Sequence, residues 1–152
     1  MRPCVRGPVA IAFILLGCHQ SDASPATCGL NDDGGALDVS GRVDGLYGIV
    51  DGRVGQAPLA HFDRMARTDS GVGLKDGKKW IGLHMEGDEA RAFQQFTASP
   101  PGRGIVGVVG GTVVFRHRIR VPITSAEAQV SCCNPQYCDR WEALVPVKGD
   151  AG

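Results

Sequence analysis

The stretch Ile105-Val106-Gly107-Val108-Val109-Gly110-Gly111-Thr112-Val113-Val114-Phe115 indicates the fold most clearly in this 152-residue chain. Two apolar, β-branched runs flank Gly110-Gly111, a pair suited to the positive φ angles of a two-residue hairpin loop. The second run alternates beyond Phe115. One expected face carries Val113, Phe115, His117, Ile119 and Val121, and the other carries Val114, Arg116, Arg118 and Arg120. The pattern predicts an antiparallel hairpin with a core face and a largely solvated face.

Other segments predict strands and helices around this hairpin. Strands are expected near residues 46–50, 79–85 and 128–132, and apolar spacing favours helices over residues 58–66 and 87–98. A further helix is expected to begin at Asn134-Pro135. From residue 79 the order is strand, helix, three strands, helix, which predicts an α+β fold: a small antiparallel sheet with helices packed on one face, in ferredoxin-like order. The expected core contains Phe93, Phe96, Phe115, Ile119 and Trp141.

The first eighteen residues predict export. A basic start, with Arg2 and Arg6, precedes an apolar run over residues 9–16, as in a secretion signal. That run is shorter than the roughly 20 residues needed to cross a bilayer. Leu15-Leu16-Gly17-Cys18 resembles the lipobox of bacterial lipoproteins, in which the cysteine is lipidated and begins the mature chain. The alternative is an ordinary signal peptide in which Cys18 is incidental.

The chain is therefore divided into three parts. Residues 1–17 are the expected lipoprotein signal peptide, residues 18–42 a flexible tether rich in Ser, Asp, Gly and Pro, and residues 43–148 the folded domain. Acyl chains such as palmitate on Cys18 would anchor the protein to a membrane of the bacterial cell envelope, facing the periplasm. His19, rather than an aspartate, follows Cys18, which favours the outer membrane.

Composition and motifs restrict the classes of function. Sixteen basic and sixteen acidic residues give a formal net charge of zero, which argues against a nucleic-acid partner. Neither Gly-x-Ser-x-Gly nor His-Glu-x-x-His occurs in the sequence. We therefore expect no catalytic residues, no cofactor and no metal, and a role in contacting a protein, a polypeptide or the envelope.

The stretch from Trp80 to Pro146 resembles the head subdomain of the first periplasmic region of the SecD/SecDF protein-export family. The resemblance rests on Ile81-Gly82-Leu83-His84-Met85-Glu86-Gly87-Asp88-Glu89-Ala90-Arg91-Ala92-Phe93, Phe96-Thr97, Gly102-Arg103, the hairpin over residues 105–113, Arg120-Val121-Pro122-Ile123 and Gln129-Val130-Ser131. It implies a stand-alone head-like domain that contacts polypeptide. Gly110 replaces the family's turn aspartate, Cys132-Cys133 stands where a glycine is usual, and no membrane helices follow, so the family's proton-driven motor is not implied.

Four cysteines remain in the expected mature chain besides Cys18: Cys28, Cys132, Cys133 and Cys138. An exported chain meets oxidants, so disulfides are expected, with three possible connectivities. On an extended strand end, Cys132 and Cys133 point to opposite faces and do not pair with each other. We favour Cys133 with Cys138 and Cys28 with Cys132. A thiolate metal or redox site is the alternative.

Two side-chain groups remain as binding candidates. Arg116, Arg118 and Arg120 form a basic stripe that suits an acidic peptide, a lipid headgroup or a polysaccharide, or is simply a solvated strand face. His84 and His117 lie on predicted strands and would form a two-histidine metal patch if they were neighbours. An envelope enzyme would need one of these histidines together with an acid and a nucleophile.

Overall fold

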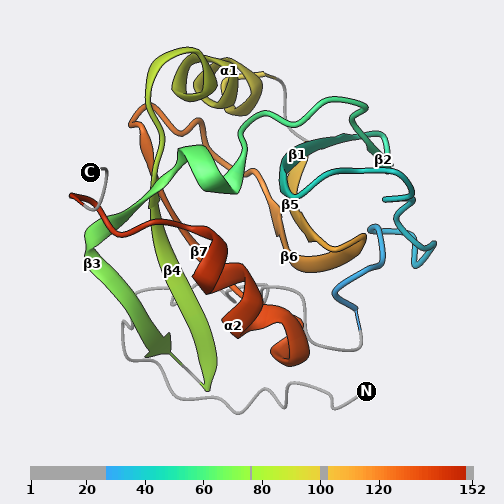
Figure 1. The fold of residues 1–152 in the computed structure, drawn as a ribbon. Helices are drawn as coiled ribbons and strands as arrows, with labels where there is room; N and C mark the ends of the chain where they lie inside the picture. Colours follow the sequence, from blue (N-terminus) through green and yellow to red (C-terminus); the bar gives the residue numbers. More distant parts are fainter. Residues whose placement is uncertain (1–26, 76, 100–102, 150–152) are drawn as a thin grey trace, which may run out of the picture.

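The computed structural model describes residues 27–75, 77–99 and 103–149, and Figure 1 shows the arrangement of their strands and helices. The elements are β1 (Gly45–Val50), β2 (Arg53–Val54), a 3₁₀ turn η1 (Phe62–Arg64), β3 (Ala66–Lys75), β4 (Lys78–His84), α1 (Gly87–Thr97), β5 (Gly104–Val109), β6 (Thr112–Arg118), β7 (Glu127–Ser131) and α2 (Pro135–Leu144). The predicted α+β class is confirmed.

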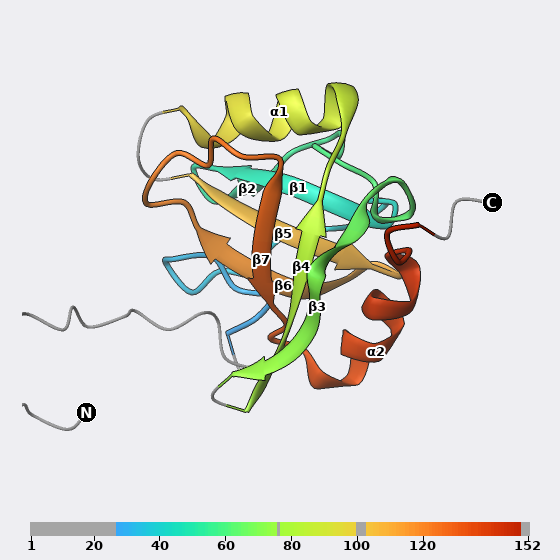
Figure 2. The ribbon, with the colours of Figure 1, turned by 90° about the vertical axis from the view of Figure 1, so that its left-hand side faces the viewer.

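The strands form two antiparallel sheets rather than the single sheet expected. One sheet has the order β2-β1-β5-β6 and the other β3-β4-β7. Figure 2 shows the strands of the second sheet running across those of the first, with α1 and α2 at different ends of the assembly. The chain changes sheets after β6 through residues 119–126, where Pro122 cannot donate to a strand ladder.

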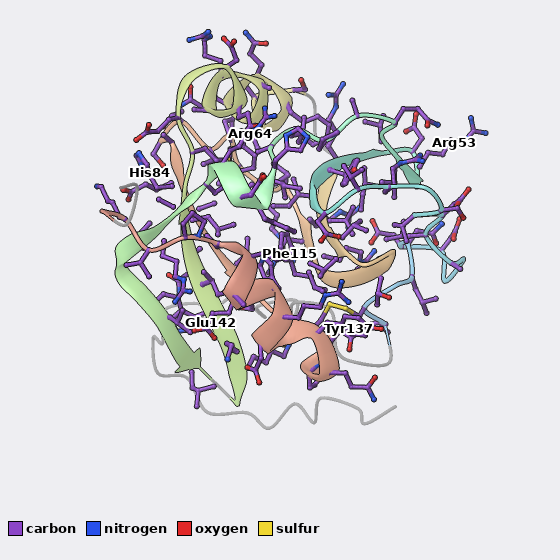
Figure 3. The ribbon with its side chains drawn as sticks, viewed as in Figure 1. Arg53, Arg64, His84, Phe115, Tyr137 and Glu142 are labelled. Carbon is purple, nitrogen blue, oxygen red and sulfur yellow. A yellow bond between two sulfur atoms is a disulfide. The ribbon has the colours of Figure 1, made fainter. Side chains whose placement is uncertain are left out.

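The main core lies between the sheets and is closed by both helices. It joins Leu46 and Ile105 of the first sheet to Ile81 and Leu83 of the second. At its centre the ring of Phe115 lies 4.9 Å from that of Trp141 and 6.2 Å from that of Phe62, and Figure 3 shows Phe115 inside the molecule. Of the predicted core residues, Phe93, Phe115, Ile119 and Trp141 are buried, whereas Phe96 is partly exposed.

The β5–β6 hairpin forms at Gly110-Gly111 as predicted, but the alternation along β6 is interrupted. Gly107 pairs with Phe115 and Val108 with Val113, so Val114 is an extra residue in a β-bulge. Val113 consequently faces the outer side of its sheet, while Val114 and Phe115 both belong to the main core. The prediction that Val113 and Phe115 share a face is wrong for this reason.

A second apolar cluster covers the outer face of the first sheet. Val106, Val108 and Val113 pack there against Cys28 and Leu37, which are 4% and 7% exposed. Residues 27–42 were expected to belong to a flexible tether. They instead pack on the domain, because Cys28, Leu37 and Val39 of this mostly polar segment cover valines that would otherwise be exposed. Residues 18–26, with Cys18, lie outside the described residues, as do the signal peptide and His19.

Residues 58–66 do not form the expected helix. Leu46 donates from its backbone N–H to the carbonyl of Ala60, and Leu59 donates to the carbonyl of Leu46. This pairing with β1 holds residues 59–60 extended, so only the single 3₁₀ turn η1 fits before β3 begins.

Both helices predicted after residue 85 are present. α1 buries Ala90, Phe93 and Thr97 on one face, and its first turn carries Asp88 and Glu89, where acids complement the helix dipole. α2 begins with Pro135 and buries Cys138 and Trp141. In the part of the chain that the structure describes, neither is long and apolar enough to cross a membrane.

Candidate functional site

The four described cysteines form two disulfides, Cys28–Cys133 and Cys132–Cys138. The favoured pairing was therefore wrong, although its premise holds. Cys132 and Cys133 do point to opposite sides: Cys132 belongs to the main core with Cys138, and Cys133 to the outer cluster with Cys28. The sequence did not indicate which cysteine faces which side. Because all four sulfurs are bonded in pairs, none of them offers a thiolate to a metal.

The predicted basic stripe is divided by the N-terminal segment. Asp32 accepts from Nη1 of Arg116 at 3.1 Å, and its other oxygen lies 3.5 Å from Nη2 of Arg118. Arg120 is exposed and follows the end of β6. Two of the three arginines are thus turned toward residues that were expected to be tether.

Arg116 and Arg118 line a cavity of about 170 Å³ at one end of the first sheet. Three segments meet there: residues 31–33, the turn between β1 and β2, and the adjoining ends of β5 and β6. The charged and polar lining residues are Asn31, Asp32, Asp33, Asp51, Arg103, Arg116, His117 and Arg118. We call this site the mixed-charge pocket. The described lining contains three arginines and three aspartates, so their formal charges cancel.

The mixed-charge pocket is shaped by two local features. Asp51 and Gly52 form the two-residue turn between Val50 and Arg53, with φ angles of 49° and 72°, which is the conformation a tight hairpin requires. Asn31 lies against this turn, because a Cβ on Gly52 would be 3.2 Å from its side-chain nitrogen. The Oδ1 of Asn31 is buried without a hydrogen-bond partner among the described residues.

The two strand histidines are not brought together. His117 lies in the mixed-charge pocket, and its Nε2 accepts from the backbone N–H of Ser131 at 3.2 Å. His84 lies 3.4 Å from Glu86 and 3.5 Å from Glu127, at the other end of β7. Within residues 27–75, 77–99 and 103–149, no serine, threonine or cysteine lines the pocket, and no group of three metal-binding side chains is found.

Strand β3, at the edge of the second sheet, was not predicted. The backbone N–H of Arg67 donates to the carbonyl of Pro146 at 2.8 Å, and Arg67 forms a parallel bridge with Val147. Among the described residues, the C-terminal segment pairs with the beginning of this edge, at Arg67. Farther along β3, Leu74 is 76% exposed. The apolar residues at 72 and 74 were the only sequence signal for this strand.

A group of ion pairs that the sequence did not indicate fastens α2 to the second sheet. Nζ of Lys79 contacts Asp139 and, at 2.7 Å, Glu142, and Arg67 contacts Glu142 at 3.4 Å. Figure 3 shows Glu142 on the side of α2 nearest β3 and β4. Hydrogen bonds to Asp139 and then Glu142 raise the pKa of Lys79 above its usual value.

Comparison with known proteins gives a partial structural likeness. No protein-family model and no curated protein matches the chain. A solved structure described as "Structure and function of a membrane component SecDF that enhances protein export" is similar over 60% of this chain, with 19% sequence identity and a TM-score of 0.46. The match spans 41% of that longer chain. A likeness of this size concerns the course of part of the backbone and carries no information on activity or partners.

Proposed function

We propose that this protein is a lipid-anchored component of the bacterial envelope whose domain binds an extended polypeptide along β3 and catalyses no reaction. The observation that carries the proposal is the long edge of β3, which the described residues 27–75, 77–99 and 103–149 leave partly uncovered. At Arg67 the backbone of β3 already pairs with the extended segment Pro146-Val147, and the exposed Leu74 lies farther along the strand. Strand addition to such an edge is a general mode of polypeptide recognition.

The disulfides support export. Pairing of Cys28 with Cys133 and of Cys132 with Cys138 suits an oxidising compartment such as the periplasm. The sequence of residues 1–18 supplies the matching signal and the acceptor Cys18. Together they favour a membrane-anchored protein facing the periplasm, with the outer membrane favoured by His19.

The anchor is tested by labelling cells with radioactive palmitate. The wild-type protein should take up the label and sediment with membranes, and Cys18→Ser should do neither. Cys4→Ser, which changes the other cysteine of the leader, is the matched control and should behave like the wild type. Labelling that survives Cys18→Ser would refute lipidation at this residue.

Polypeptide binding is tested with a ten-residue peptide of alternating valine and threonine. Amide exchange should slow at residues 71–74 when the peptide is added. The same peptide with alternate backbone nitrogens methylated should not protect these amides, because it cannot complete the strand ladder. Equal protection by both peptides would contradict strand addition.

Side-chain variants locate the binding edge. Leu74→Lys should weaken peptide binding, because a charge on an edge strand opposes further pairing. Val121→Lys is the matched control, since Val121 is 70% exposed and lies outside every strand. If the two variants bind equally well, β3 is not the docking edge.

A further inference from the structure

We propose that the mixed-charge pocket binds an α-amino carboxylate: a group carrying a carboxylate and an ammonium on one carbon. This inference does not depend on polypeptide binding at β3. It rests on the cavity beside Asn31 and on the charged side chains that line it: three arginines, two of which contact Asp32, and two further aspartates.

The arginines of the lining suit a carboxylate. Arg116 and Arg118 each direct one guanidinium nitrogen to Asp32, and each guanidinium carries five N–H donors. Arg103, also in the lining, lies with its guanidinium carbon 5.1 Å from the centre of the Phe96 ring. Asp32 thus holds two arginines in place while leaving further donors for a ligand.

The two remaining aspartates suit an ammonium. Asp33 and Asp51 are both exposed and line the same cavity, and neither contacts Arg116 or Arg118 in the ion pairs that Asp32 forms. An ammonium group suits such carboxylates, because it has three donors and no acceptor.

Charge and size together select the ligand class. Three arginines and three aspartates cancel, so a polyanion gains no net attraction and meets Asp33 and Asp51. The volume of about 170 Å³ is below the roughly 300 Å³ of the smallest drug-sized pockets. It equals the space of about five or six water molecules, which suits one amino-carboxylate group.

Two sources carry this chemistry in the envelope: free amino acids, and the unsubstituted end of a diamino acid within a cell-wall peptide. Binding is measured by calorimetry on the full mature chain in detergent. The probes are glycine, a stem peptide containing meso-diaminopimelate, acetate and methylammonium. Glycine or the stem peptide should bind, and whichever binds more tightly identifies the source. Acetate and methylammonium should each bind more weakly.

Variants test the arginines and the aspartates of the lining separately. Arg116→Gln should weaken binding at least about tenfold, as expected for the loss of a charged hydrogen bond. Asp51→Asn should also weaken binding, and asparagine tolerates the positive φ at this turn. Arg120→Gln is the matched control, since Arg120 is not in the pocket lining, and should bind within about twofold of the wild type.

Three results would overturn the proposal. The first is an absence of binding by any amino carboxylate to the folded protein. The second is acetate binding as tightly as glycine, which would mean that the ammonium is not recognised. The third is equal loss of binding in Arg116→Gln and Arg120→Gln, which would indicate a general charge effect.

Discussion

The two sheets differ in how their exposed parts are covered. Residues 27–39 cover the outer face of the β2-β1-β5-β6 sheet and are fixed there by the Cys28–Cys133 disulfide. Among the described residues, Pro146 and Val147 are the ones that pair with the β3 edge of the β3-β4-β7 sheet. The valines of the first sheet are thus buried under a disulfide-linked segment, whereas β3, which contains polar residues and glycine, carries no such cover from the described chain. We expect the first sheet to contribute more to stability, and the proposed function assigns polypeptide contact to the second.

Removing the disulfide of the covered sheet should have the largest effect. Cys28 and Cys133 are 105 residues apart, and Cys132 and Cys138 six. By chain entropy the double variant Cys28→Ser/Cys133→Ser should lose about 4–5 kcal/mol of unfolding free energy, and Cys132→Ser/Cys138→Ser about 2 kcal/mol. Urea unfolding of both variants measures the difference. Equal losses would show that the long loop does not dominate.

In each sheet, a glycine lies against an aromatic ring, and the cost of replacing it with alanine should differ between the two sheets. A Cβ on Gly48 would lie 2.4 Å from the Phe96 ring, and one on Gly73 would lie 2.6 Å from the Trp80 ring. Gly48→Ala in the inner strand β1 should cost about 1–3 kcal/mol, because Phe96 is held by α1. Gly73→Ala in the edge strand β3 should cost less, since there the sheet can move outward. Thermal unfolding measures the stability loss of each variant. A larger loss in Gly73→Ala than in Gly48→Ala would contradict the expectation that the edge strand adjusts more easily to an added methyl group.

Surface charges on the covered sheet should matter little for stability. Asp32→Asn removes the partner of Arg116 and Arg118, yet Asp32 is 57% exposed. We expect a loss below about 1 kcal/mol of unfolding free energy. Arg91→Gln, which breaks the exposed Asp88–Arg91 pair within α1, is the control and should cost a similar amount. A much larger loss in Asp32→Asn would mean that this pairing helps to hold residues 27–39 in place.

The smallest effect concerns pH and the second sheet. The pKa of Lys79 is raised by its bonds to Asp139 and Glu142, so folding favours the protonated lysine. The resulting stability is fully present below the ordinary pKa of 10.5 and is lost as pH rises through the higher folded-state pKa. Lys79→Met should flatten this alkaline decline in urea titrations that run from about pH 10 to about pH 12, upward from that ordinary value. An unchanged pH profile would show that another group causes the decline.

Local patterns predicted the elements that pack by their own periodicity. The apolar face of α1 and the Gly110-Gly111 hairpin were both readable from spacing alone. The Val114 bulge was not, because it depends on how β5 aligns with β6. Strand β3 was missed because Thr-Asp-Ser-Gly at residues 68–71 breaks the alternation that a half-buried strand shows.

The sequence predicted only part of the candidate site. The arginines of β6 were visible as a stripe, but their partner Asp32 is 84 residues from Arg116. Only tertiary packing brings these two together. The cysteine pairing likewise depended on which side of the second sheet meets α2, and no local pattern contains that information.

The Cys28–Cys133 disulfide attaches the chain to the domain at residue 28. It therefore limits the distance between the domain and an anchor at Cys18. If Cys18 carries the acyl chains, ten residues separate it from Cys28, because 28 − 18 = 10. Ten residues extend at most roughly 35 Å, far less than a linker reaching to residue 42 would allow. The mixed-charge pocket and the edge of β3 would then sample only a thin layer above the lipid headgroups, so partners would have to come close to the bilayer to be met.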